Sequence, residues 1–418
     1  MEDNEELAPV AVIETIPDLE HLARELVGVD RVAVDLESDS FYAYHEKVCL
    51  LQLSSPYEDF IVDPLATRDL SPLGPMFRDP AIEKVFHAGE YDLICLKRDY
   101  GFDIANIFDT MVAARTLGAK ELGLAALVNK HFNVVLSKKL QRSDWGKRPL
   151  TQEQYAYARL DTHYLLELRD ILHKELAAKD RLRDARDEFE RVVRVQPPER
   201  EFDPNAFWRL AGARELTPAG RAVLKGIYLF RERTASELDK AAFRVLPEPL
   251  MVRLAAESPR DLDALQRMRG MTPYLFSRYG KDLLAAVGEG LAAEPVEREP
   301  ERRQNKRWDL ATMRRYETLR QWRKKKAEEG GVDTVVILPT DDLRTLAQVP
   351  ERVHYPEQWL EALTPRKREL YGPEILEILA APLPETAAAG TAAGGRRRRR
   401  RRRGGGSGGP ANGTGAAS

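Results

Sequence analysis

Two acidic residues at the end of one predicted strand have the types and spacing of metal ligands. Asp35 and Glu37 close a mostly apolar, β-branched run at residues 31–38, which is typical of a strand inside a covered sheet. Because side chains alternate along a strand, both carboxylates leave the same face of the sheet. Their mutual repulsion raises their pKa values, and a divalent cation removes it. Oxygen ligands without Cys or His favour Mg²⁺ or Mn²⁺ over zinc.

A third candidate ligand, Asp161, lies on a helix that we expect to begin at Thr151, which forms a capping-box pattern with Gln154. The expected core-facing stripe consists of Tyr157, Asp161, Tyr164, Leu168 and Leu172. The expected outward positions are Arg159, Thr162, His163, Glu167 and Asp170, and we give His163 no role. A carboxylate in a buried stripe is costly unless a cation meets it. Since no Lys or Arg shares the stripe, a metal is the candidate partner of Asp161.

Strand and helix patterns alternate around these residues. Strands are predicted at residues 10–13, 31–38, 47–53, 60–62, 83–86 and 106–108, and the turn at 54–59 predicts a hairpin. Asp18 is predicted to cap a helix through Leu26, and Asp109 a helix at 111–117. Asp92 falls in the first turn of a helix that stops near Gly101, and a further helix is predicted at 122–131. The mixture predicts an α/β domain, with a mixed sheet flanked by helices on both faces.

Together these residues form an ordered set of motifs. The set comprises Asp35, Glu37, Asp92, Tyr157 and Asp161, with Ser143-Asp144-Trp145, Arg148-Pro149-Leu150 and Gln154 between them. It resembles the DEDD family of 3′-5′ exonucleases, in its tyrosine-bearing subgroup, and within it ribonuclease D. The resemblance covers about residues 10–195 and implies a ribonuclease H-like α/β fold. Ser137 departs from the acidic residue that relatives often carry there.

The resemblance implies hydrolysis with two divalent ions, Mg²⁺ or Mn²⁺, which clamp the attacking and leaving oxygens of a phosphodiester. It implies that Asp35 bridges both ions, that Glu37 and Asp161 complete the first, and that Asp92 holds the second through water. Tyr157 would orient the attacking water, because an ordinary phenol is too weak an acid to serve as a base near neutral pH. Nucleoside 5′-monophosphates would leave one at a time from a 3′ end.

Other residues near these motifs have two readings. His87, Lys138, Arg142 and Arg148 are candidate nucleic-acid contacts, with a structural histidine and solvated surface cations as the alternative. Trp145 is expected to anchor the loop that leads into the long helix. Taken singly, the Asp35–Glu37 pair is more typical of a solvated strand end, and Tyr157 of a core residue. The complete set favours catalysis.

The rest of the chain contains an internal repeat. After a linker at 196–209, Leu246-Pro247 and Leu338-Pro339, like Thr272-Pro273 and Thr364-Pro365, are separated by 92 residues. The two copies, at 210–293 and 308–381 with a linker at 294–307, resemble the helical HRDC domain of RecQ helicases and ribonuclease D. They would bind nucleic acid, or only pack against the nuclease. In the second copy, Val335-Val336-Ile337 reads as strand-like, and Gly280 and Gly372 are expected between the last two helices or at the start of the final one.

Composition sets further expectations. Residues 1–9 are expected to be flexible, and their acidic character excludes an ordinary signal peptide. Cys49 and Cys95 are expected to be buried thiols of a reducing compartment, with a disulfide as the alternative. No apolar run approaches membrane-spanning length, so we expect a cytoplasmic protein without a membrane partner. No obligate protein partner is readable, and a monomer is the default expectation.

The Ala-, Gly- and Arg-rich tail at 382–418 is expected to be disordered. The formal net charge is −2, and −10 without the tail's eight consecutive arginines. These are Arg396, Arg397, Arg398, Arg399, Arg400, Arg401, Arg402 and Arg403. Such a run would hold RNA phosphates without regard to sequence, with a solubility or localisation tail as the alternative.

Three functions remain at this point. The first is a metal-dependent 3′-5′ exoribonuclease that trims structured RNA at single-stranded 3′ ends, with precursor transfer RNA as the family's typical substrate. The second is a DNA 3′-5′ exonuclease with the same type of site. The third is a non-catalytic RNA-binding protein. The loop at 143–150 and the twin HRDC-like domains favour RNA, and the intact acidic set argues against a scaffold.

Overall fold

The computed structural model of the protein describes residues 10–198, 201–300, 308–348, 358, 360–361 and 363–381. The expected flexible N-terminus at 1–9 lies outside the described residues, as does the arginine run Arg396–Arg403 with the rest of the tail from residue 382.

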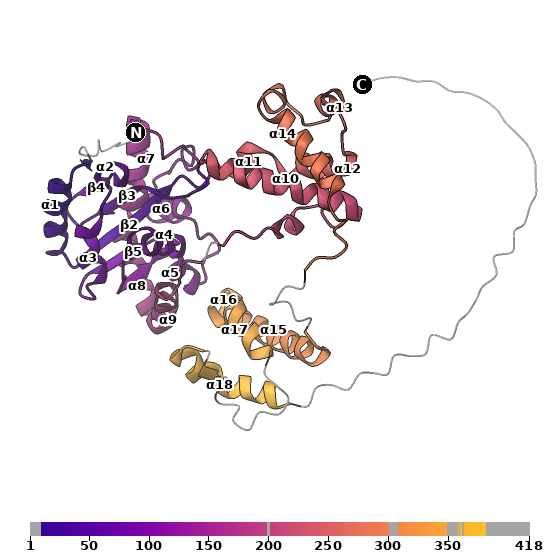
Figure 1. Ribbon diagram of the computed structural model, residues 1–418. Helices are drawn as coiled ribbons and strands as arrows, with labels where there is room; N and C mark the ends of the chain where they lie inside the picture. Colours follow the sequence, from indigo (N-terminus) through magenta and orange to yellow (C-terminus); the bar gives the residue numbers. More distant parts are fainter. Residues whose placement is uncertain are drawn as a thin grey trace, which may run out of the picture. The chain divides into compact units, whose positions relative to one another are not determined.

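A mixed six-stranded sheet forms the centre of the N-terminal domain (Figure 1). Its spatial order is β1-β4-β3-β2-β5-β6. β3 pairs antiparallel with β2 and with β4, whereas the β1–β4, β2–β5 and β5–β6 pairs are parallel. The strands are β1 (Ala11–Ile13), β2 (Arg31–Ser38), β3 (Val48–Ser54), β4 (Asp59–Val62), β5 (Glu83–Phe86) and β6 (Ile107–Asp109). The predicted mixed sheet and its hairpin are therefore confirmed.

Helices and short helical turns surround this sheet. They are α1 (Ile16–Leu26), α2 (Pro64–Thr67), η1 (Ser71–Leu73), α3 (Gly74–Arg78), α4 (Glu90–Tyr100), α5 (Thr110–Thr116), α6 (Leu124–Phe132), α7 (Gln152–His163), α8 (Leu165–Ala178) and α9 (Leu182–Val193). The predicted cap of the first helix was wrong by three residues. Thr15 is the N-cap of α1, and its side chain accepts a hydrogen bond from the Asp18 amide.

Strand β2 presents Asp35 and Glu37 on the face of the sheet that α7 covers. Asp35 lies opposite Gln52 and Glu37 opposite Leu50 across the β2–β3 pair, and opposite residues share a face. Leu50 packs in a small core with Ala158 of α7, which identifies that face. The register shifts between Glu37 and Ser38, and such irregularities re-aim side chains next to active sites.

Helix α7 begins as predicted and ends earlier. Thr151 accepts a hydrogen bond from the Gln154 amide while the Gln154 side chain accepts one from the Thr151 amide, so the capping box is confirmed. The prediction of one continuous helix through Leu172 was wrong, because α7 ends at His163 and α8 starts at Leu165. The outward assignment of Thr162 is also wrong. This residue is buried, and its hydroxyl is 2.7 Å from that of Ser54.

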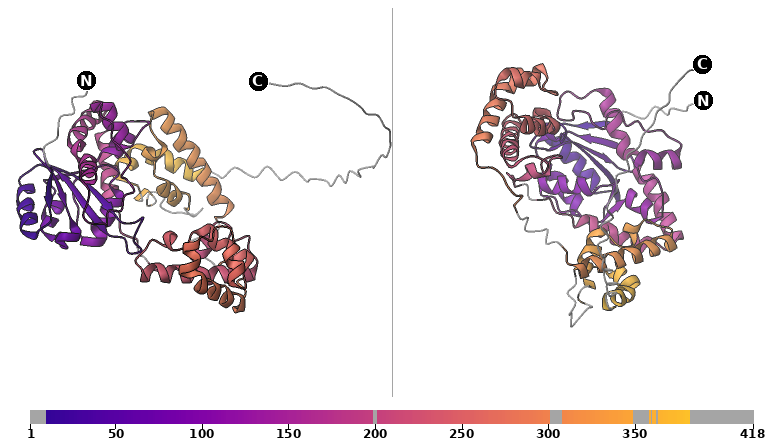
Figure 2. Two further views of the ribbon diagram at one scale, coloured as in Figure 1. Left: turned by 90° about the horizontal axis from the view of Figure 1, so that it is seen from above. Right: turned by 90° about the vertical axis from the view of Figure 1, so that its right-hand side faces the viewer.

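The C-terminal region is helical in two similar segments (Figure 2). After η2 (Ala206–Arg209), the first contains α10 (Pro218–Glu237), α11 (Ala242–Val245), α12 (Glu248–Glu257), α13 (Leu262–Arg267) and α14 (Pro273–Ala292). The second contains α15 (Leu310–Gly330), α16 (Thr334–Ile337), α17 (Thr340–Ala347) and α18 (Pro365–Ala380). Helices α15, α16, α17 and α18 begin 92 residues after α10, α11, α12 and α14, so the repeat in the sequence is a repeat of structure.

Two predictions for this region were wrong. Residues 335–337 are not strand-like, because they belong to the short helix α16, whose first turn Asp333 caps. Gly280 and Gly372 lie inside α14 and α18 rather than before the last helix. In the first segment the reason is packing: a Cβ at Gly280 would lie 3.2 Å from the ring of Phe276.

Each segment has its own core, one built on Leu224, Ile227 and Leu283 and the other on Leu319, Leu343 and Ile375. Cys49 and Cys95 are buried free thiols, which excludes the alternative of a disulfide between them. Among the described residues no helix is both long and apolar enough to cross a membrane.

Candidate active site

Three elements bring four carboxylates together. Asp35 and Glu37 come from β2, Asp92 from the first turn of α4, and Asp161 from the last turns of α7. Burial raises the pKa of Asp35 far above its ordinary value, and the charges of Asp92, Asp161 and Glu37 raise it further. Burial, with Asp161 and Asp92, raises the pKa of Glu37 to about 9. The four side chains are therefore close enough to repel one another.

The other two carboxyl groups behave in the same way. Burial, with the charges of Asp109 and Asp161, raises the pKa of Asp92 to about 8. Burial raises the pKa of Asp161 to about 7. In the part of the chain that the structure describes, none of the four forms an ion pair with a cation or a hydrogen bond to another side chain. The group is thus a concentration of negative charge without a positive partner.

A buried amide adds to this imbalance. Gln52, opposite Asp35 on β3, is fully buried, and neither amide atom of its side chain has a hydrogen-bond partner among the described residues. Unpaired buried polar groups are rare and costly, and here they adjoin the repelling carboxylates. Gln52 was not among the predicted site residues. Its only signal was its place, in the middle of an apolar strand.

The turn before α4 sets the position of Asp92. The Asp109 carboxylate accepts hydrogen bonds from the amides of Ala88 and Gly89, at 3.2 and 2.9 Å, and from those of Met111 and Val112 at the start of α5. The predicted N-cap role of Asp109 is confirmed, and the same carboxylate also fixes the turn into α4. Residue 89 must be glycine, because a Cβ there would lie 2.6 Å from Phe86 Cβ.

Tyr157 lies one helical turn before Asp161 on α7. Burial, then the charges of Asp161, Glu37 and Asp35, raises its pKa well above the ordinary phenol value. The phenol therefore stays protonated near neutral pH, as a hydrogen-bond donor. The ring of Trp145 lies 6.0 Å from that of Tyr157, and Trp145 is fully buried, so its predicted anchoring role is confirmed.

Comparisons with known proteins agree with this arrangement. A 3′-5′ exonuclease family model matches residues 10–177, and an HRDC domain model matches residues 220–287 and 313–379. Ribonuclease D of Gluconacetobacter diazotrophicus is 30% identical over 370 residues, which cover 88% of this chain and 92% of the relative. The chain belongs to the ribonuclease D family.

Two further proteins extend this family relationship. The crystal structure of Escherichia coli RNase D, described as an exoribonuclease involved in structured RNA processing, matches with a TM-score of 0.63 and 26% identity. The match covers 89% of this chain and 99% of that one. The exosome complex component 10 homolog of Caenorhabditis elegans is 33% identical over 285 residues, or 67% of this chain. The chain spans about a third of that relative's length, 32%.

The chemistry of the four clustered carboxylates fits a divalent ion. It offers four carboxylates and no cation, which is the oxygen-rich set that Mg²⁺ and Mn²⁺ prefer. Protonation or a cation must relieve the repulsion that raises these pKa values. In the ranges described above, no three His, Cys, Asp or Glu side chains converge closely enough to hold an ion unaided. The charges therefore fit a metal, and the side chains would have to draw closer to bind it.

The candidate phosphate contacts fall into two groups. Arg148 was predicted to contact phosphate, but its guanidinium is occupied. It donates to both carboxylate oxygens of Asp63, at 2.6 and 2.8 Å, and to the carbonyls of Cys49 and Trp145. Arg148 thus fixes the loop before α7. Lys138 and Arg142 are exposed, and Arg142 lies over the ring of Phe41.

His87 is half-buried, with Nδ1 2.9 Å from the Thr110 hydroxyl. Burial lowers its pKa, so a neutral imidazole is favoured there near neutral pH.

A second cluster, centred on Asp59, holds α7 against the sheet, and it was not predicted from the sequence. Asp59, the first residue of β4, accepts from Arg159 Nε at 2.5 Å and lies 2.8 Å from His163 Nδ1. It also accepts from the Ser54 hydroxyl at 2.7 Å. His163 was given no role and is in fact part of this cluster. Its residues flank Asp161, so the Asp59 cluster sets the orientation of the helix that carries it.

Proposed function

We propose that this chain is a divalent-metal-dependent 3′-5′ exoribonuclease that releases nucleoside 5′-monophosphates from RNA 3′ ends. The observation that carries the proposal is the group of Asp35, Glu37, Asp92 and Asp161, whose raised pKa values have no cation to offset them. A binding scaffold gains nothing from clustered, partly buried charges that repel one another. Membership of the ribonuclease D family supports the same activity.

In this proposal Asp35, Glu37, Asp92 and Asp161 hold two ions, Mg²⁺ or Mn²⁺. When bound, the ions supply charge neutralisation for the attacking and leaving oxygens of the phosphodiester. Tyr157 donates a hydrogen bond that orients the attacking water, because its raised pKa keeps the phenol protonated. Gln52 faces the same side of the sheet as Asp35, and its amide supplies a donor and an acceptor beside the reacting groups.

We assign the RNA contacts to exposed cations and one histidine. Lys138 and Arg142 lie on the loop that leads into α7 and contact phosphates, while His87 lies before the turn into Asp92. Arg396–Arg403, outside the described residues, add a salt-sensitive tether. The substrate we favour is structured RNA with a single-stranded 3′ end, such as precursor transfer RNA. Escherichia coli RNase D, a structural relative, is described as acting in structured RNA processing.

For the domain division we propose an exonuclease domain at 10–195 and HRDC-like domains at 210–293 and 308–381, joined by linkers at 196–209 and 294–307. We also propose that the protein works as a cytoplasmic monomer. Two buried free thiols fit a reducing compartment.

The test is a time course on a 5′-labelled RNA with a single-stranded 3′ extension, with Mg²⁺, Mn²⁺ or chelator and a matched DNA strand. Stepwise shortening that needs metal and prefers RNA supports the proposal. Equal shortening of DNA would replace it with a DNA exonuclease. Tight RNA binding without shortening, unchanged by Asp161→Ala, would replace it with a non-catalytic RNA-binding protein.

A further inference from the structure

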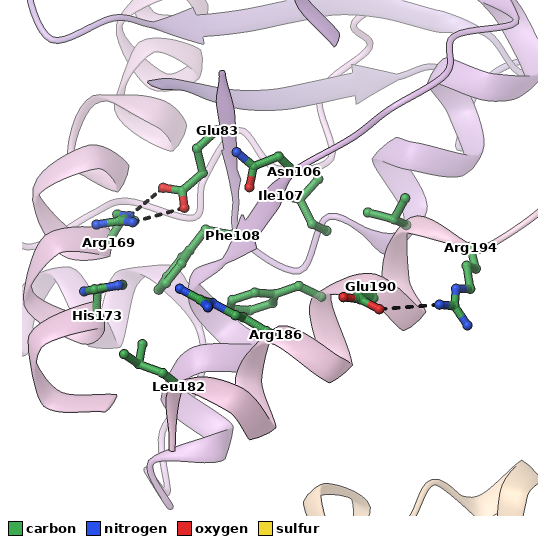
Figure 3. A pocket seen from close by; sticks show the side chains of 12 residues that line it. Glu83, Asn106, Ile107, Phe108, Arg169, His173, Leu182, Arg186, Glu190 and Arg194 are labelled. Atoms are coloured by element: carbon green, nitrogen blue, oxygen red, sulfur yellow. Dashed lines mark hydrogen bonds and ion pairs between the residues drawn. The ribbon is translucent and has the colours of Figure 1, made fainter. Parts of the chain in front are cut away.

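A cavity of about 510 Å³ lies between strand β6 and helices α8 and α9, within the nuclease domain (Figure 3). Its wall includes Phe108 and Phe189, whose rings are 4.8 Å apart, and Leu182. The volume is that of a small-ligand site with an apolar wall.

The cavity is separate from the acidic group. Glu83, the cavity residue on β5, lies beside Arg31 in the register of the β2–β5 strand pair. Arg31 is the first residue of β2, whereas Asp35 and Glu37 lie toward the end of that strand. At the rise of an extended strand, Arg31 and Asp35 are about 13 Å apart along the chain. A ligand in this cavity therefore does not use the carboxylates of the proposed active site.

Two of the cations that line the cavity already have partners. Arg169 donates to both carboxylate oxygens of Glu83, at 2.6 and 3.0 Å, and lies over the Phe108 ring. Arg194 pairs with Glu190 at 3.4 Å, where both side chains are exposed. In these pairs the two arginines neutralise the two glutamates that line the cavity. The net charge of the cavity wall therefore depends on the other ionisable side chains.

The remaining ionisable groups are Arg186 and His173. Across residues 10–198, 201–300 and the later described segments, neither side chain has a hydrogen bond or an ion pair. In Figure 3 the dashed lines join Arg169 to Glu83 and Glu190 to Arg194, and none reaches Arg186 or His173. Arg186 is thus an exposed positive charge without a side-chain partner at this cavity, and His173 is a half-buried imidazole whose ring lies 6.5 Å from that of Phe108.

We propose that this cavity is a second nucleotide site, which takes one nucleobase with its phosphate, either as a unit of RNA or as a free nucleoside monophosphate. Imidazole and phenyl planes stack on unpaired bases, which assigns the base to His173 and Phe108. Arginine forms strong charge-assisted hydrogen bonds with phosphate, so the phosphate is assigned to the Arg186 guanidinium. The choice of a nucleotide among flat anions rests on the RNA substrate proposed above.

The experiment is a calorimetric titration of the full-length protein with 5′-AMP in chelator, where no hydrolysis takes place. Arg186→Ala should weaken AMP binding about tenfold, the loss of one charge-assisted contact. The matched control is Arg183→Ala, which removes an exposed arginine from the same helix outside the cavity. It should bind AMP as the unchanged protein does, and both variants should melt at the same temperature. Asp35→Asn/Asp161→Asn should also keep AMP binding.

Other ligands decide what the site recognises. Adenosine should bind less tightly than AMP, since it lacks the phosphate for Arg186. Displacement of AMP by a short oligoadenylate, lost in Arg186→Ala, would identify an RNA unit as the ligand, and no displacement would identify the free nucleotide. Equal AMP binding by Arg186→Ala and Arg183→Ala would overturn the proposal, as would equally strong displacement by a glutamate peptide.

These outcomes separate the cavity from the nuclease activity. Arg186-dependent AMP binding by a protein that shortens no RNA would reject the proposed function and keep the nucleotide site. Metal-dependent RNA shortening without AMP binding would do the reverse.

Discussion

Helix α7 contributes to two clusters: the four carboxylates that include Asp161, and the cluster around Asp59. The clusters differ in whether cations offset the negative charge. Burial alone would raise the pKa of Asp59, but its bonds to His163, Ser54 and Arg159 lower it. Asp161, two residues from both Arg159 and His163, has no such partner, and burial raises its pKa to about 7. One carboxylate is part of the scaffold and the other is held ready for a ligand. The comparison shows that cationic partners, rather than the residue type, distinguish an aspartate that stabilises the fold from one that is available to bind a ligand.

The largest expected effect is a loss of nuclease activity when one of the four carboxylates without a cationic partner is replaced. Asp35→Asn and Asp161→Asn should each lower the rate of RNA shortening at least about a thousandfold, because a metal-binding charge is removed. Single-turnover assays with 5′-labelled RNA in Mg²⁺ measure this. A rate within tenfold of the unchanged protein would show that these aspartates are not metal ligands.

The reverse behaviour is expected of the compensated group. Asp59→Asn should lower the free energy of unfolding by about 3 kcal/mol, because it leaves Arg159 half-buried without its carboxylate. Urea unfolding measures the change. The control is Glu83→Gln, which breaks a similar pair with Arg169 away from α7. If Asp59→Asn stays as stable as the unchanged protein but loses all activity, the division between the two groups fails.

A smaller effect is expected when only the phenol changes. Tyr157→Phe keeps the ring against Trp145 and removes the hydroxyl, so we expect about a hundredfold lower rate and an unchanged melting temperature. The variant should bind Mn²⁺ as tightly as the unchanged protein does. Weakened metal binding would instead make the tyrosine a ligand or a support for one.

The smallest effect is a gain in stability. The pKa of Glu37 is about 9 in the folded protein, against an ordinary value of 4.5. The contribution of the Glu37 carboxyl to folding stability is therefore complete below about pH 4.5 and is lost as the pH rises toward about 9, because the unfolded chain ionises first. In chelator, Glu37→Gln should raise the free energy of unfolding at about pH 8 by roughly 1–2 kcal/mol and change little at about pH 5. Denaturant unfolding at both pH values measures it, and a loss of stability at pH 8 would contradict the repulsion.

Much of the site was readable from the sequence where the interaction is local. Two-residue alternation placed Asp35 and Glu37 on one face, and a three-residue spacing identified the capping box at Thr151. Asp109 as a helix cap followed from its neighbours in the chain. These features depend on backbone geometry over a few residues, which the sequence determines directly.

The misread residues depend on partners far along the chain. Arg148 looked like a phosphate contact because Asp63, its partner 85 residues earlier, gave no sign of proximity. His163 and Thr162 looked exposed because the break between α7 and α8 turns them toward β3 and β4. Periodicity assumes one continuous helix, and it fails where tertiary contacts end that helix.

The most direct test of the central claim is thermal unfolding of the unchanged protein from about pH 5 to about pH 9, in chelator and in excess Mn²⁺. We predict that the melting temperature falls with rising pH in chelator, as the carboxyl groups of Asp161, Asp92 and Glu37 ionise against one another. Mn²⁺ should remove most of this fall, and it should not do so for Asp35→Asn/Asp161→Asn. The same pH dependence with and without Mn²⁺ would contradict the claim that these carboxylates form a metal site.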